Sequence, residues 1–143
     1  MRRSQRSSNG SAVPEPPVPP EVDAFLRRPN PAVIATLRPD GSPHTVATWY
    51  DWDDERALVN MEATRLRLQF MRRDPRVSLT ALGEDNWYAH VSLLGRVVSL
   101  ADDPDLVDID RLARRYTGNP FRRRDAKRVS AWIEIDRWHA WDL

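Results

Sequence analysis

The most constraining feature of the sequence is a series of short strand-like segments separated by turns of hairpin length. Residues 32–37 are a run of apolar and β-branched residues, and in the turn that follows Pro39 fixes one dihedral and Gly41 supplies a positive φ. Further strands are expected over 45–52, 57–61, 76–82, 87–100, 129–135 and 138–141. Because tight turns join antiparallel strands, this order predicts a mainly β protein, an antiparallel barrel rather than a parallel doubly wound sheet.

Segments whose apolar residues have helical spacing interrupt the strands, and they predict helices on the rim of the barrel. A short helix opens the folded part, and a longer one is expected over 64–73 with Thr64 as its capping residue. Another helix is expected to open at Asp102 or Asp103, next to Pro104.

The first 20 residues differ in composition from the rest of the chain. Arginine, serine and glycine come first and five prolines follow, a mixture that cannot bury apolar surface. We therefore expect a disordered Pro-rich tail over 1–20 and one folded domain over 21–143, a size that suits a single core. A polybasic adhesive tail is the functional alternative, supported only by three arginines among serines.

Composition excludes several classes of function. The net charge is +1, from 22 basic and 21 acidic residues, which gives no field for binding nucleic acid. The absence of cysteine excludes disulfides and thiolate sites and fits a cytoplasmic protein. The histidines lack metal-ligand spacing, and no apolar run approaches the roughly 20 residues of a membrane span. There is no glycine-rich phosphate loop and no nucleophile elbow, so no catalytic residue is identified and a bound cofactor would carry any reaction.

The segment 60–67 contains the most informative charges. A strand ends there and a helix begins, and the start of a helix is the positive end of its dipole. The sequence nevertheless places Arg65 and Arg67 at this point. A phosphate bound by the amides, by Thr64 and by the two guanidinium groups would relieve the repulsion. The alternative is a solvated arginine face paired with Glu62, and spacing alone does not separate the two.

Six tryptophans and three histidines supply the remaining candidates. Large aromatic side chains are mostly core or interface residues, but a flat ring system would also need such walls, which keeps Trp49 and Trp87 in consideration. His90 fits either a packed barrel histidine or a donor that lines a cofactor cleft.

Several blocks of the sequence then recur in the order and spacing of a known family. These blocks are 32–43, 48–50, 59–67, 71–79, 87–98 and 110–118. Together they make residues 22–141 resemble the pyridoxamine 5'-phosphate oxidase-like split barrels, specifically the flavin/deazaflavin oxidoreductases of actinobacteria that use coenzyme F420.

The resemblance implies a six-stranded antiparallel split β-barrel of the FMN-binding type and a homodimer with cofactor clefts at the interface. It also implies cofactor-binding residues. Thr64, Arg65 and Arg67 would hold the phosphate, with Asn60 as a polar contact at the strand end. The ring would lie along Val46, Ala47, Thr48 and Trp49, and Trp87 and His90 of a second copy would close the cleft.

By this resemblance the chain is expected to be an enzyme that transfers a hydride from reduced F420 to a small or planar conjugated acceptor. Arginines stand where the FMN-dependent branch has a lysine, which favours the deazaflavin. The alternatives are an FMN-binding split-barrel oxidoreductase, a non-catalytic cofactor- or tetrapyrrole-binding protein, and a structural dimer without a ligand.

Overall fold

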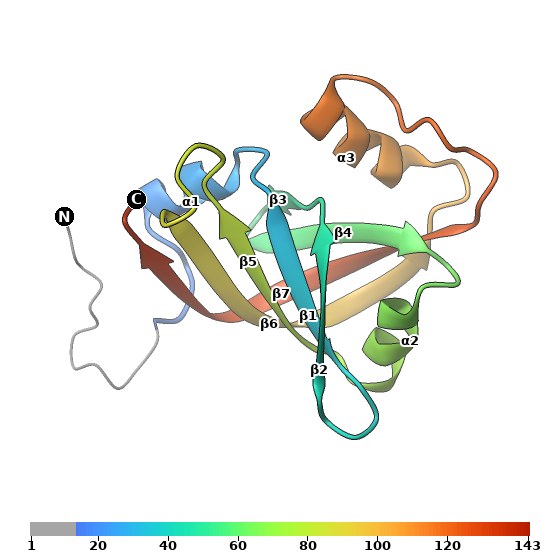
Figure 1. The fold of residues 1–143 in the computed structure, drawn as a ribbon, viewed down its shortest axis with the longest axis horizontal. Coiled ribbons are helices and arrows are strands. Elements are labelled where there is room, and N and C mark those ends of the chain that lie inside the picture. The colour runs from blue at the N-terminus through green and yellow to red at the C-terminus, as the bar shows by residue number, and fades with distance from the viewer. Residues whose placement is uncertain (1–13) are drawn as a thin grey trace.

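The computed structural model describes residues 14–143 of the chain. These residues form seven strands and three helices, in the order α1 (Pro20–Leu26), β1 (Ala32–Leu37), β2 (Pro43–Thr48), β3 (Asp51–Asp53), β4 (Arg56–Glu62), α2 (Leu66–Arg73), β5 (Arg76–Leu82), β6 (His90–Asp102), α3 (Val107–Thr117) and β7 (Arg128–Trp141). The strands form one antiparallel sheet with the order β2-β1-β5-β6-β7-β4-β3 (Figure 1). The expected mainly β architecture with flanking helices is confirmed.

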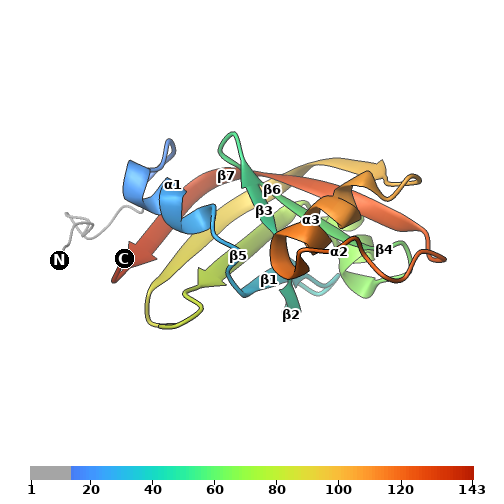
Figure 2. The same ribbon diagram turned by 90° about the horizontal axis from the view of Figure 1, so that it is seen from above.

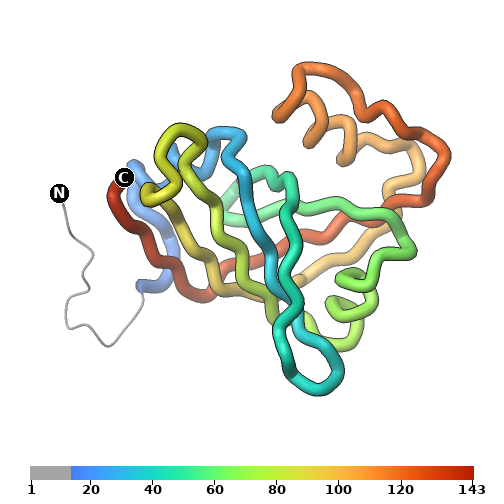
Figure 3. The backbone as a smooth tube through the Cα atoms, in the orientation of Figure 1, coloured from blue at the N-terminus to red at the C-terminus, as the bar shows by residue number. Residues whose placement is uncertain are grey.

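The sheet curls because two strands that are consecutive in the chain lie at its opposite edges. Only Trp49 and Tyr50 separate β2 from β3, and the tube in Figure 3 shows the chain crossing there. The single strand expected over 45–52 is therefore wrong. Tyr50 is fully buried and its hydroxyl donates to the Leu26 carbonyl oxygen at 2.8 Å, which holds the crossing inside the protein. The short β3 also brings the number of strands to seven rather than six.

The longest pairing in the sheet joins β6 to β7. The two strands expected over 129–135 and 138–141 are a single strand, β7, whose register shifts where Gly95 pairs with Ile135. A β-bulge accommodates the extra residue, so the chain continues instead of ending. A Cβ atom on Gly95 would lie 2.2 Å from the Glu134 carbonyl oxygen, so only glycine allows the two backbones to approach this closely.

Both longer helices begin later than expected. Arg65, rather than Thr64, is the N-cap residue of α2, and no side chain caps this helix. α3 begins at Val107, but the Asp103 carboxylate still accepts hydrogen bonds from the Asp108 and Ile109 amides, at 3.2 and 3.0 Å. Asp103 therefore caps α3 as expected, although it stands three residues before the N-cap residue, Leu106.

The Pro-rich segment is packed from Pro14 onward. The Trp138 amide donates to the Pro14 carbonyl oxygen at 3.0 Å, the Trp138 indole donates to the Glu15 carbonyl oxygen at 3.1 Å, and Val18 is buried. Residues 14–20, which the sequence assigns to the tail, therefore belong to the folded domain. The rest of the expected tail lies outside the described residues.

Two apolar clusters stabilise the fold. The larger one fills the curled sheet, where side chains such as Ile34, Met61 and Leu79 are fully buried. The smaller one lies beneath α3 and contains Leu106, Ile109 and Leu112, with Trp49 and Phe121 against them. Figures 1 and 2 show α3 outside the sheet, near β4. Within residues 14–143, no helix is long and apolar enough to cross a membrane.

Candidate functional site

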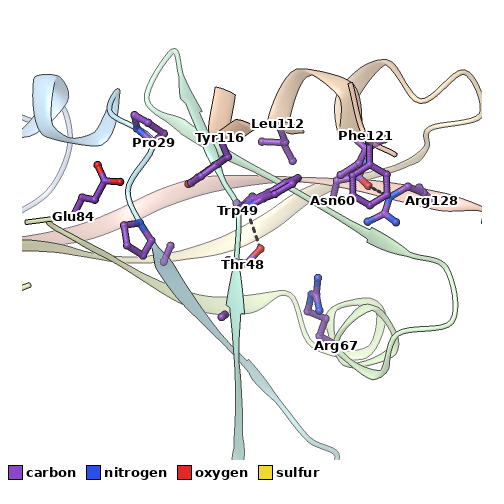
Figure 4. Close-up of a pocket in the computed structure, with 14 residues that line it drawn as sticks. Pro29, Thr48, Trp49, Asn60, Arg67, Glu84, Leu112, Tyr116, Phe121 and Arg128 are labelled. Atoms are coloured by element: carbon purple, nitrogen blue, oxygen red, sulfur yellow. Dashed lines mark hydrogen bonds between the residues drawn. The ribbon is translucent and has the colours of Figure 1, made fainter. Parts of the chain in front are cut away.

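A cleft of about 540 Å³ lies between α3 and the strands. Its lining residues come from the loop before β1 and the start of β1, the end of β2, β4, the turn after β5, both longer helices, the loop after α3 and the start of β7 (Figure 4). They are Pro29, Pro31, Ala32, Ala47, Thr48, Trp49, Asn60, Arg67, Glu84, Ile109, Leu112, Tyr116, Phe121 and Arg128. Figure 4 shows Arg67 and Arg128 at one end of the cleft and Glu84 at the other. The cleft therefore has a cationic end, an apolar middle and an acidic end.

Three aromatic side chains form one wall of the cleft. Trp49 stacks on Tyr116 with a centroid distance of 5.4 Å and an interplanar angle of 9°, and it meets Phe121 edge-on at 6.1 Å. The Tyr116 hydroxyl donates to the Asn30 carbonyl oxygen at 2.7 Å, and burial raises the pKa of this hydroxyl. The wall is thus a fixed apolar surface, suited to a flat ring system.

Arg115 holds the C-terminal end of α3, which carries Tyr116 of this wall, against the domain. Its guanidinium group donates hydrogen bonds of 2.6 to 3.0 Å to four backbone carbonyl oxygens, those of Tyr50, Leu26, Arg27 and Arg28. It also lies 3.3 Å from the Asp51 carboxylate. α3 is therefore attached to the domain by polar contacts as well as by its small apolar cluster.

Arg67 is a partly buried cation that faces the cleft. Its Nε atom is buried and has no hydrogen-bond partner among the described residues, and its guanidinium forms no ion pair there. Burial, followed by repulsion from Arg65 and Arg128, lowers its pKa. A buried donor without a partner costs free energy, which an anion in the cleft would offset.

Arg128 is the second cation at this end. It is 9% exposed and lies over the Phe121 ring at 4.7 Å, and its Nε donates to Asn60 Oδ1 at 2.7 Å. Burial is the main cause that lowers its pKa. No carboxylate of residues 14–143 lies within ion-pair distance of it. Sequence reasoning missed Arg128, although β4 and β7 pair Glu62 with Arg128 and so bring the start of β7 beside the end of β4.

The structure brings five of the expected site residues to the cleft: Ala47, Thr48, Trp49, Asn60 and Arg67. The Thr48 hydroxyl donates to the Trp49 carbonyl oxygen at 2.8 Å. The side-chain amide of Asn60 is already bonded to protein groups on both its oxygen and its nitrogen.

The other expected residues lie outside the cleft of this chain. Val46 packs against the main core, and Thr64 is exposed in the turn before α2. Arg65 is exposed and pairs with Glu62 at 3.4 Å, which is the alternative weighed for it from the sequence.

Trp87 and His90 lie in and after the turn between β5 and β6. Trp87 is 65% exposed and stacks on Tyr88 at 4.7 Å, and His90 Nδ1 is 2.7 Å from the Tyr88 carbonyl oxygen. They were expected to act on a second copy's cleft, and for that role they stay a prediction.

Comparisons with known proteins agree with this geometry. The family model described as pyridoxamine 5'-phosphate oxidase matches residues 18–142. An F420H(2)-dependent biliverdin reductase from Mycobacterium tuberculosis (strain CDC 1551 / Oshkosh) is 30% identical over 115 residues, which cover 80% of this chain and 81% of that protein.

Solved structures show the same likeness. An F420 reductase structure superposes with a TM-score of 0.78 at 27% identity, covering 85% of this chain and 98% of that one. A conserved hypothetical protein from Mycobacterium tuberculosis superposes with a TM-score of 0.69 at 26% identity, covering 90% and 86%. The fold is a split barrel, and the chain belongs to the pyridoxamine 5'-phosphate oxidase family.

Proposed function

We propose that the protein is an F420-dependent oxidoreductase that transfers a hydride from the reduced deazaflavin to a small or planar conjugated acceptor. One observation carries the proposal. The guanidinium groups of partly buried Arg67 and buried Arg128 lie at the end of an aromatic-walled cleft, with no carboxylate of residues 14–143 paired to them. Such an end is built for an anion, and such a wall for a flat ring.

The residues present fit the cofactor. The phosphate of the deazaflavin would accept hydrogen bonds from the terminal guanidinium nitrogens of Arg67 and Arg128, and its charge would offset the burial of the Arg67 cation. The ring would lie against the backbone of Ala47 and Thr48 and against Trp49. The names of the relatives, an F420H(2)-dependent biliverdin reductase and an F420 reductase, support the deazaflavin over FMN.

When bound, the reduced deazaflavin supplies a hydride, and this chain supplies binding, orientation and exclusion of water. Ile109 and Leu112 of α3 cover the apolar middle of the cleft. The hydroxyls of Tyr50 and Tyr116 both donate to backbone carbonyl oxygens. For this reason we assign no proton-donating residue.

We further propose that the protein acts as a homodimer in which a second copy closes the cleft. Several large apolar side chains exposed outside the core support this, because apolar surface gathered on a domain marks interaction sites. They are Trp87, Tyr88, Leu94, Val98 and Trp141, each 45% or more exposed. Trp87 and His90 are the residues that we propose to reach the partner's cleft.

Titration of the purified protein with oxidised F420, reduced F420 and FMN tests the proposal. We expect micromolar or tighter binding of the deazaflavin and weaker binding of FMN, followed by oxidation of reduced F420 when biliverdin, a quinone or an unsaturated ketone is added. If FMN binds more tightly than F420, the FMN-dependent alternative replaces the proposal. Tight F420 binding without turnover would support a carrier, and no binding of either would exclude both flavin functions.

A further inference from the structure

We infer that Asn60 and Asp103 are positioning residues that aim Arg128 at the ligand's phosphate, and that Asp103 also fixes the α3 wall of the same cleft. The inference rests on the proposed function and extends it to residues that need not touch the ligand's phosphate. One buried polar network would then support both the cationic end and the apolar wall of the cleft.

The first part of the network is the Asn60 amide. Asn60 is 5% exposed, and its Nδ2 donates to Asp103 Oδ2 at 3.1 Å and to Ser130 Oγ at 3.0 Å, while its Oδ1 accepts from Arg128 Nε at 2.7 Å. A guanidinium can only donate and a carboxylate can only accept. The two charged neighbours therefore fix which way the amide points, and the amide in turn fixes Arg128.

The choice of an amide at position 60 leaves the charge of Arg128 available. No hydrogen bond or ion pair among residues 14–143 joins the Asp103 carboxylate to Arg128, and the neutral Asn60 side chain bonds to both. The terminal guanidinium nitrogens of Arg128 form no hydrogen bond to residues 14–143, and Arg128 lines the cleft. A carboxylate at position 60 would pair with Arg128 directly and compete with the phosphate. An asparagine orients the cation without neutralising it.

The second part of the network is the Asp103 carboxylate, which is 5% exposed. Its oxygens accept from Asn60 Nδ2 and from the first-turn amides of Asp108 and Ile109 in α3. Ser130 Oγ donates to Asp108 Oδ2 at 2.6 Å and ties the same turn to β7. Since Ile109 lines the cleft, Asp103 supports the apolar wall as well as the cationic end.

The two residues should thus fail in different ways. Losing Asn60 frees Arg128 but leaves the α3 cap in place. Losing Asp103 removes the orientation of Asn60 and the cap together, and a lost cap loosens the first turn of its helix. Losing Asn60 should weaken binding of the phosphate but not of the ring. Losing Asp103 should weaken both.

The experiment compares two probes that differ only in the phosphate, 8-hydroxy-5-deazariboflavin and its 5'-phosphate. The ratio of their dissociation constants is the phosphate increment. For the wild-type protein we expect an increment of roughly tenfold or more, the usual value of charge-assisted hydrogen bonds. Asn60→Leu and Asn60→Ala should lower it to about threefold or less, by the same reasoning, with little change for the unphosphorylated probe. Asp103→Ala should lower the increment and also weaken the unphosphorylated probe.

Val59→Ala is the matched control, because it removes fully buried apolar atoms from the same strand without touching the network. It should lower the melting temperature and leave the phosphate increment unchanged. Asn60→Leu is nearly isosteric and places no second carboxylate beside Asp103, so it tests the role even if Asn60→Ala does not fold. An increment that stays at the wild-type value in Asn60→Leu would overturn the inference alone. A wild-type protein that binds neither probe, or binds both equally, would overturn the phosphate site and with it the proposed function.

Discussion

Two groups of arginines surround the cleft and do different work. Three on and near α3 are neutralised: Arg111 lies 2.5 Å from Asp51, Arg115 binds four carbonyl oxygens and Asp51, and Arg124 pairs with Asp110 at 2.9 Å. Arg67 and Arg128 have no carboxylate partner among residues 14–143. The same side chain thus fastens a helix in one group and leaves a charge for a ligand in the other.

The difference follows from what each group must achieve. α3 buries only a small apolar cluster, so the arginines that attach it supply stability that burial alone does not provide. At the other end of the cleft, pairing would cancel the charge that attracts an anion. Keeping two cations there without a carboxylate partner costs free energy of folding, and a bound phosphate would offset that cost. Substitutions in the two groups should therefore change different measured quantities.

The largest effect is expected from Arg115→Ala. The substitution removes four hydrogen bonds beneath α3, and we expect the free energy of unfolding to fall by roughly 2–4 kcal/mol. The Leu26 oxygen keeps the Tyr50 hydroxyl as a donor and the Arg28 oxygen keeps the Asn30 amide, so the loss falls mainly on the Tyr50 and Arg27 oxygens. Urea denaturation measures the loss. Arg115→Lys should recover little of it, because an ammonium group does not present the planar fork that reaches these oxygens. A fully stable Arg115→Lys protein would show that charge, rather than the hydrogen bonds, attaches α3.

The next effect is expected from Arg67→Met, and on ligand affinity rather than stability. Removing the guanidinium should weaken F420 binding by roughly 1.5–3 kcal/mol, the contribution of charge-assisted hydrogen bonds. Without ligand, the protein should be as stable as the wild type or slightly more so, because the buried cation is repelled by Arg65 and Arg128. Titration and urea denaturation of the same sample measure both quantities. Lower stability without lower affinity would place Arg67 in the structural group.

The sequence predicted the fold better than it predicted the site. Turn residues such as Gly41 and the apolar run of β1 act locally, so the strands and their antiparallel pairing could be inferred. The break between β2 and β3 could not, because alternation continues through Trp49 and Tyr50 while the chain passes between sheet edges. That crossing depends on the distant carbonyl oxygen of Leu26, which holds the Tyr50 hydroxyl.

For the site, local reasoning selected both Arg65 and Arg67, of which the structure brings only Arg67 to the cleft. Both occupy the start of α2, and spacing gives no sign that one faces the cleft while the other lies in solvent beside Glu62. Arg128 was missed because its importance comes from pairing between β4 and β7, 60 or more residues apart. Burial and pairing across long sequence separations, rather than residue type, distinguish the arginines that line the cleft from the others.

A smaller effect on the free energy of unfolding is expected from Asp110→Asn, which tests the ion pair between Asp110 and Arg124. Hydrogen bonds from Arg124 lower the pKa of Asp110 to about 2 from its ordinary 3.8. A lowered pKa in the folded state means that the carboxylate stabilises the protein fully above about pH 4 and less as the pH falls toward 2. Because Arg124 is half exposed, we expect a loss of only about 1 kcal/mol. Urea denaturation at pH 7 and pH 3 should show that the difference between variant and wild type shrinks in acid. An equal difference at both pH values would contradict this assignment.

The smallest effect is expected from Arg65→Ala, which tests where the anion lies. The Arg65 side chain is 57% exposed, and Glu62 keeps Arg123 as a partner at 3.1 Å when Arg65 is removed. Loss of long-range attraction and relief of the repulsion on Arg67 act in opposite directions, so F420 affinity should change by no more than about 0.5 kcal/mol. The change should diminish at high salt, because exposed charges are screened. If Arg65→Ala instead weakens F420 as much as Arg67→Met does, the phosphate lies on the exposed rim of α2, and the cationic end of the cleft is not its binding site.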